Sequence, residues 1–160
     1  MESGRLSNTV AAALSHYFAS FTGQARTLTA DLSEEEFWTK PYPYGNSVGH
    51  LLLHLTGNLS HYIGTHIANT GYVRNRPLEF TDTSHRPKED VLRALEDAVA
   101  MVVRTIEAQQ PDDWSRAYAA PGVEDPTRFS MVLHCASHFH HHLGQIIYLA
   151  KEHARRRHPQ

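Results

Sequence analysis

The chain has 160 residues, a formal net charge of −2 and 41% hydrophobic residues, as expected for one globular domain spanning residues 1–160. This near-neutral balance excludes a strongly basic nucleic-acid-binding protein, and no apolar run is long enough to suggest a signal peptide or a membrane span. The single cysteine, Cys135, excludes an internal disulfide and favours a cytoplasmic location.

Four segments repeat apolar residues at helical spacing and predict four long helices. The first runs from Ser7 to about Ala30, the second from a cap at Asn46 or Ser47 to about Ala68, the third from Pro87 to its end at Pro111, and the fourth from about Phe129 to Glu152. Long connections follow the second helix, over residues 72–86, and the third, where Pro121, Gly122 and Pro126 lie. We therefore expect an all-α fold, a four-helix bundle with antiparallel neighbours.

Three further segments have simple structural interpretations. Residues 33–36 have the form of a capping box and predict a short helical turn that carries Phe37 and Trp38. Cys135 lies beside the fourth helix's histidine row and is interpreted as a small packed residue. The basic run 155–157 is interpreted as a solvated tail.

Histidine is the unusual feature of this composition, with 13 residues concentrated in two of the predicted helices. At 3.6 residues per turn, one face of the fourth helix presents His134, His138 and His142, with His141 and Gln145 on the same side. His140 points nearly the opposite way, so we expect it to be exposed or at an interface. On the second helix, one stripe consists of His50, His54, Asn58 and His61.

These two rows predict a metal site. Histidines four residues apart stand roughly 6 Å apart on one helix face and can converge on one ion. A third histidine from a facing helix would complete a set that leaves one side open, as in catalytic zinc sites. Imidazole also suits nickel, copper and iron(II). The alternative is that these are ordinary hydrogen-bonded core histidines. No His-Glu-x-x-His motif or paired Glu-x-x-His motif is present, which excludes those metal centres.

Two motifs resemble those of one family. Residues 46–55, NSVGHLLLHL, resemble the second-helix motif of the DinB/YfiT-like superfamily, and residues 138–146, HFHHHLGQI, resemble its fourth-helix motif. The resemblance implies that His54, His138 and His142 bind one divalent metal ion, with zinc or nickel preferred over iron or manganese. His50, one turn before His54, is the alternative ligand. It also implies long crossover connections and a homodimer.

Characterised relatives of this kind include thiol transferases and thiol-dependent isomerases. The resemblance therefore implies a metal-dependent enzyme, a thiol S-transferase or hydrolase, that acts on a small-molecule substrate with a low-molecular-weight thiol. Candidate substrate contacts are Arg74, Arg76 and Glu79 in the long loop, together with Asn58, Tyr62 and Gln145, although the loop residues could instead only hold the loop in place. Two alternatives stay open: a non-catalytic, stress-related metal-binding homodimer, and a metal-free helical module whose histidines lie at a dimer face.

Overall fold

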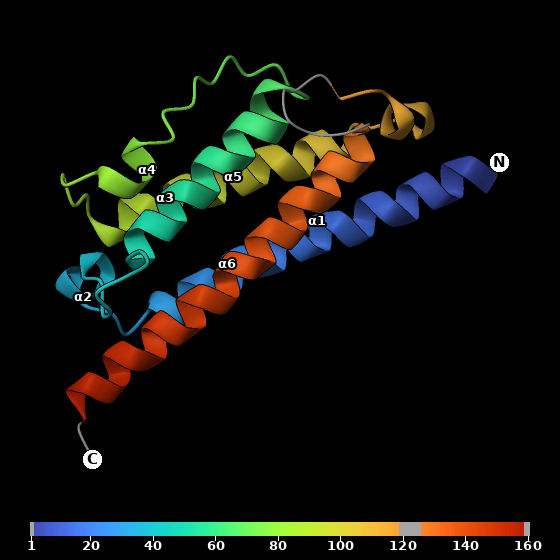
Figure 1. Cartoon of the computed structure of the whole chain (residues 1–160). Helices are drawn as coiled ribbons and strands as arrows, with labels where there is room; N and C mark the ends of the chain where they lie inside the picture. Colours follow the sequence, from blue (N-terminus) through green and yellow to red (C-terminus); the bar gives the residue numbers. More distant parts are fainter. Residues whose placement is uncertain (1, 119–125, 159–160) are drawn as a thin grey trace.

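The computed structural model describes residues 2–118 and 126–158, so Pro121 and Gly122 of the second predicted connection lie outside the described part. The described residues form helices and no strand, apart from an isolated bridge between Ala117 and Thr127 (Figure 1). The elements are α1 (Glu2–Thr29), α2 (Glu34–Trp38), α3 (Val48–Leu59), the π-helix η1 (Ser60–Thr65), α4 (Leu78–Thr81), α5 (Lys88–Glu107), the 3₁₀ helix η2 (Pro111–Ser115) and α6 (Arg128–Arg157). The predicted all-α fold is confirmed.

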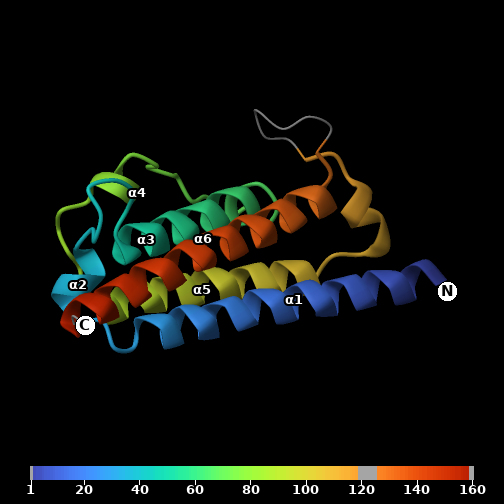
Figure 2. The same ribbon diagram turned by 60° about the horizontal axis from the view of Figure 1, so that its bottom comes forward.

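Four long helices, α1, α3, α5 and α6, pack as a bundle in which α1 and α3 each contact both α5 and α6 (Figures 1 and 2). The connection from η1 to α5 returns along the bundle, so α3 and α5 run in the same direction. The expectation of simple antiparallel neighbours is therefore wrong for this pair. The long crossover implied by the family resemblance is present, and it carries α4 past α3.

Local capping explains where the helices begin. Ser33 and Glu36 form the predicted capping box of α2. Ser47 caps α3 by accepting a hydrogen bond from the backbone N–H of His50, and Thr127 caps α6 in the same way. The second predicted helix differs from expectation at its end, because α-helical geometry stops at Leu59 and a π turn follows. Neither α4 nor η2 was predicted.

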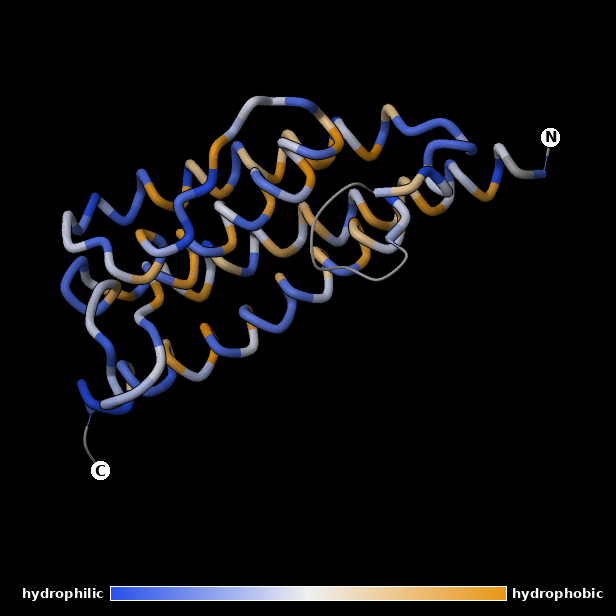
Figure 3. The backbone as a smooth tube through the Cα atoms, turned by 45° about the horizontal axis from the view of Figure 1, so that its top comes forward, coloured by the Kyte–Doolittle hydropathy of each residue, from blue (hydrophilic) through white to orange (hydrophobic). Residues whose placement is uncertain are grey.

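The core lies between the four long helices. Figure 3 shows hydrophobic residues recurring along each of them, separated by hydrophilic ones. Fully buried side chains include Phe18, Leu55, Ile106 and Phe139, one from each helix. Cys135 is completely buried, as predicted. This packing fixes the spacing between α3 and α6, the two histidine-rich helices.

The basic C-terminal run is not simply a solvated tail. It forms the last turn of α6, where Arg157 donates a 2.8 Å hydrogen bond to Glu36 and another to the backbone oxygen of Asp31. Arg156 contacts the backbone oxygen of Pro41. The end of α6 is thereby attached to the segments around α2. Within residues 2–118 and 126–158, no helix combines the length and apolar character needed to cross a membrane.

Candidate metal centre

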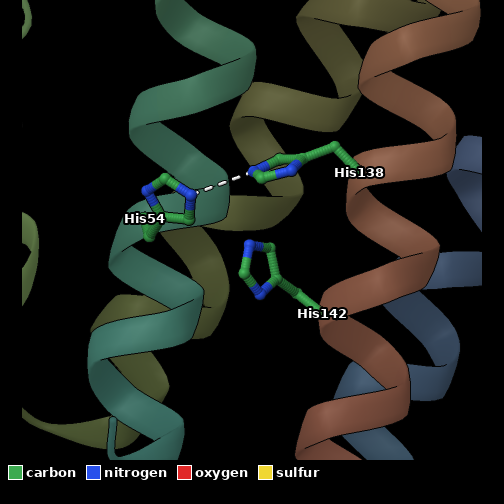
Figure 4. A group of neighbouring side chains, drawn as sticks. All are labelled: His54, His138 and His142. Atoms are coloured by element: carbon green, nitrogen blue, oxygen red, sulfur yellow. Dashed lines mark hydrogen bonds between the residues drawn. The ribbon is translucent and has the colours of Figure 1, made fainter. Parts of the chain in front are cut away.

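Three histidines from two helices converge between α3 and α6. His54 projects from α3, and His138 and His142 project from successive turns of α6, so that the three rings point toward one another (Figure 4). One nitrogen from each lies within 4.8 Å of the others. The ring centroid of His54 lies 5.0 Å from that of His138 and 5.0 Å from that of His142, and the centroids of His138 and His142 are 4.4 Å apart. No further histidine, cysteine or carboxylate among the described residues joins this group.

The buried carboxylate of Glu79 orients the ring of His54. His54 is only 5% exposed, and its Nδ1 lies 2.7 Å from Glu79 Oε2. An ionised carboxylate can only accept hydrogen bonds, so Nδ1 must carry the proton and donate it. Nε2 then presents its lone pair toward the cluster, where it lies 2.9 Å from His138 Nε2. Histidines that bind metals are commonly oriented by a carboxylate in this way.

Glu79 is held in its ionised form by Arg74. Burial alone would raise the pKa of Glu79, but hydrogen bonds from Arg74 and His54 lower it below its ordinary value. Arg74 donates from Nε at 2.7 Å and from Nη2 at 2.8 Å, the two-pronged geometry that favours arginine–carboxylate pairs. The carboxylate also needs Gly57 on α3, because a Cβ at that position would overlap it. Arg74, Glu79 and His54 therefore form one connected hydrogen-bond chain.

The orientation of His142 is set by Gln145, one turn further along α6. His142 Nδ1 donates a 2.7 Å hydrogen bond to Gln145 Oε1. Its Nε2 is buried and has no hydrogen-bond partner within residues 2–118 and 126–158. A buried acceptor without a partner is costly, about 1–3 kcal/mol, unless something else binds it. The orphaned nitrogen faces the other two histidines, where a metal ion would supply the missing partner (Figure 4).

The environment keeps the α6 histidines neutral. Burial, followed by the neighbouring rings of His142 and His54, lowers the pKa of His138 to about 4. Burial also lowers the pKa of His142, against the opposing effect of its hydrogen bond with Gln145. Only a neutral imidazole has a lone pair for a metal. The donor set, its orphaned nitrogen and its protonation thus all fit a divalent ion.

The other histidines expected near the site lie outside the cluster. The alternative ligand His50 is buried elsewhere: its Nδ1 is 2.7 Å from Ser47 Oγ and its Nε2 is 3.0 Å from the backbone oxygen of Asp82. His134 and His141 are exposed neighbours of the cluster. His140 is exposed, as expected. The structure therefore brings together His54, rather than His50, with His138 and His142.

The loop residues have structural partners of their own. Arg76 lies over the ring of Phe80, and Phe80 packs against His54 with ring centroids 4.8 Å apart. The sequence interpretation considered Glu79 as a substrate contact or as a residue that holds the loop in place, and it missed the hydrogen bond to His54. It also missed the contacts of Gly57 and Phe80 with this site. No spacing signal could have revealed them, because 25 residues separate His54 from Glu79 along the chain.

Fold and site together define a helical bundle with a three-histidine cluster of the metal-binding type. A family model described as the DinB superfamily matches residues 18–146, which include α3 and the part of α6 that carries His138 and His142. The chain belongs to this superfamily, as the sequence resemblance predicted. No curated protein matches the chain significantly in sequence.

Proposed function

We propose that His54, His138 and His142 hold one divalent metal ion, zinc or nickel in preference to iron or manganese. The observation that carries this proposal is the convergence of three imidazole nitrogens within 4.8 Å, one of them buried without a partner. Zinc and nickel accept imidazole readily, whereas manganese prefers oxygen ligands. Glu79 and Gln145 hold the far nitrogens of two ligands, which reduces the entropy lost when the three rings are fixed around an ion.

We further propose that the metal site serves a small-molecule reaction in which a low-molecular-weight thiol is transferred to an electrophile. A divalent ion bound here would stabilise the deprotonated form of a thiol and so supply a nucleophile near neutral pH. Three protein ligands on one side leave room for such a partner. Family membership supports this reaction only as a class, because one fold can host many chemistries.

The protein's own residues would contribute position rather than proton transfer. Glu79 is engaged by Arg74 and His54, so it cannot serve as a free general base. Phe80 covers one side of His54 and would limit the access of water to that ligand. Cys135 does not compete as a nucleophile, because burial raises the pKa of its thiol to about 12. The reacting thiol would therefore come from a cofactor, in keeping with a reducing cytoplasm.

A second candidate is a metal-binding homodimer without turnover. The observation that favours it is that Glu79 is engaged in salt bridges with His54 and Arg74. Among the described residues, the cluster therefore has no free carboxylate to act as a base. Large exposed apolar side chains on α6, Leu133 at 50% and Tyr148 at 74%, would suit a homodimer in either case.

Thiol consumption distinguishes the two candidates. Metal-loaded protein would be mixed with a cofactor thiol (cysteine, glutathione, bacillithiol or mycothiol) and a reactive electrophile, and loss of free thiol would be followed. Catalysis predicts an electrophile-dependent rate that falls to background in His138→Ala and persists in His140→Ala, whose ring is exposed on another side of α6. Metal-loaded protein that accelerates none of these reactions would favour the non-catalytic candidate.

A further inference from the structure

A second pair of histidines stands apart from the three-histidine cluster. His61 lies within the π-helix η1, and His66 follows at its end. Their ring centroids are 4.8 Å apart and their planes are inclined at 84°. Within the cluster, the three ring pairs are 4.4–5.0 Å apart and inclined at 79–88°. The His61–His66 pair thus resembles the ring pairs of the cluster in both spacing and inclination.

The π turn is what brings these two side chains together. In an α-helix, residues five apart differ by about 140° around the axis and cannot face one another. The wider π turn, with hydrogen bonds from residue i to i+5, places such residues on one side. The backbone N–H of Ala68 bonds to the oxygen of Ile63 in this pattern at 2.9 Å. Departures of this kind from the α-helix often occur at functional sites.

Residues 58–66 carry three buried polar atoms that lack a hydrogen-bond partner among the described residues. These atoms are His61 Nδ1, His66 Nε2 and the side-chain oxygen of Asn58. Asn58 is 96% buried, being 4% exposed, and it lies one turn before His61. His142 Nε2, in the three-histidine cluster, is another of the unpartnered buried atoms among the described residues. A buried polar atom of this kind destabilises the folded chain if nothing binds it.

Electrostatics around His61 suit a neutral metal ligand. Burial, followed by the proximity of His66 and then Arg74, lowers the pKa of His61. Its ring therefore keeps a lone pair available near neutral pH. The adjacent Tyr118 donates its hydroxyl to the backbone oxygen of Tyr62 at 2.7 Å, so it does not supply a partner to either histidine.

From this geometry we infer that His61, His66 and the side-chain oxygen of Asn58 form a second metal site, separate from the three-histidine cluster. Two imidazoles and one amide oxygen are donors suited to zinc, copper(II) or nickel. With one imidazole fewer than the cluster, this site binds its ion more weakly. It fills at saturating metal and empties on dialysis.

Metal stoichiometry of the tag-free, full-length protein tests this inference. Protein stripped with a chelator would be titrated with Zn²⁺ in a calorimeter, and bound metal would be counted at saturation. The wild type should bind a tight ion and a weaker second ion. The double variant His61→Ala/His66→Ala should lose only the weaker ion, and His54→Ala should lose only the tight one. His66→Gln, which preserves side-chain bulk, should weaken the second ion at least tenfold even if the double variant folds poorly.

A surface histidine is the necessary control. The variant His140→Ala removes an exposed ring on another side of α6 and should retain both ions. The inference is overturned if the wild type saturates with a single ion, if His66→Gln binds the second ion as tightly as wild type, or if the surface variant is the one that loses it. Loss of the tight ion in His54→Ala is a separate result that tests the three-histidine cluster itself.

Discussion

Replacing Glu79 by glutamine should weaken metal binding without touching a ligand. The carboxylate accepts hydrogen bonds from His54 Nδ1 and from two nitrogens of Arg74, whereas an amide has only one oxygen to offer. At least one donor then loses its partner, and the imidazole of His54 is no longer held in the tautomer that presents Nε2. Loss of such a partner typically lowers metal affinity by about 10–100-fold, or about 1.4–2.7 kcal/mol.

The same change should lower stability. Glu79 and Arg74 have side chains that are 6% and 9% exposed, so an unpaired group there cannot be well solvated. We expect the metal-free protein to lose about 1–3 kcal/mol of unfolding free energy. Affinity would be measured by competition with a chromophoric chelator, and stability by thermal unfolding of the stripped protein.

Glu152→Gln is a matched control. Glu152 is also paired with two arginines, Arg155 and Arg156, but it lies about 15 Å further along α6 than His142. That variant should retain wild-type metal affinity. Equal affinities in Glu79→Gln and wild type would refute the idea that the carboxylate orients His54, even if stability fell.

Three further experiments test the surroundings of the site, the pKa of His138 and the burial of Cys135. Gly57→Ala should weaken metal binding, as Glu79→Gln does, because the new methyl group overlaps the Glu79 carboxylate. Gly144→Ala has nothing within 4 Å of its Cβ, so it should leave metal affinity unchanged and stabilise the protein by about 1 kcal/mol. Chelator competition measures the affinity of both variants, and thermal unfolding measures their stability. In metal-free protein, the thermal midpoint should fall as pH drops from 6.5 to about 4, since His138 is protonated in the unfolded chain but not in the folded one within this window. In His138→Asn the thermal midpoint should fall less steeply with pH than in wild type. Identical pH profiles in the two proteins would contradict the lowered pKa of His138. Cys135 should resist thiol reagents until the protein unfolds, so rapid labelling of the native state would contradict its burial.

Sequence periodicity predicted the four long helices because each carries apolar residues at helical spacing. The end of the second helix was not predictable in this way. Residues 60–66 keep a helical composition, and the change to a π turn depends on tertiary packing rather than on local preference. The parallel direction of α3 and α5 was likewise implied only by family resemblance.

The sequence could show which histidines share a helix face, but not which of them meet in the folded protein. Spacing on α6 placed His138 and His142 on one side, and on α3 it left His50 and His54 as alternatives. What separates those two is burial against different partners, since His50 is engaged by Ser47 and by the backbone of Asp82. The hydrogen bond from His54 to Glu79 crosses from α3 to a crossover helix that has only four residues, too short for periodicity to reveal.

Metal content of tag-free protein after dialysis is the most direct test of the three-histidine site, measured for wild type, His54→Ala, His138→Ala and the exposed-site control His140→Ala. The account predicts about one tightly held divalent ion per chain in wild type and in His140→Ala, and its loss in the other two variants. Metal-free wild type, or equal metal in all four proteins, would contradict the ligand assignment.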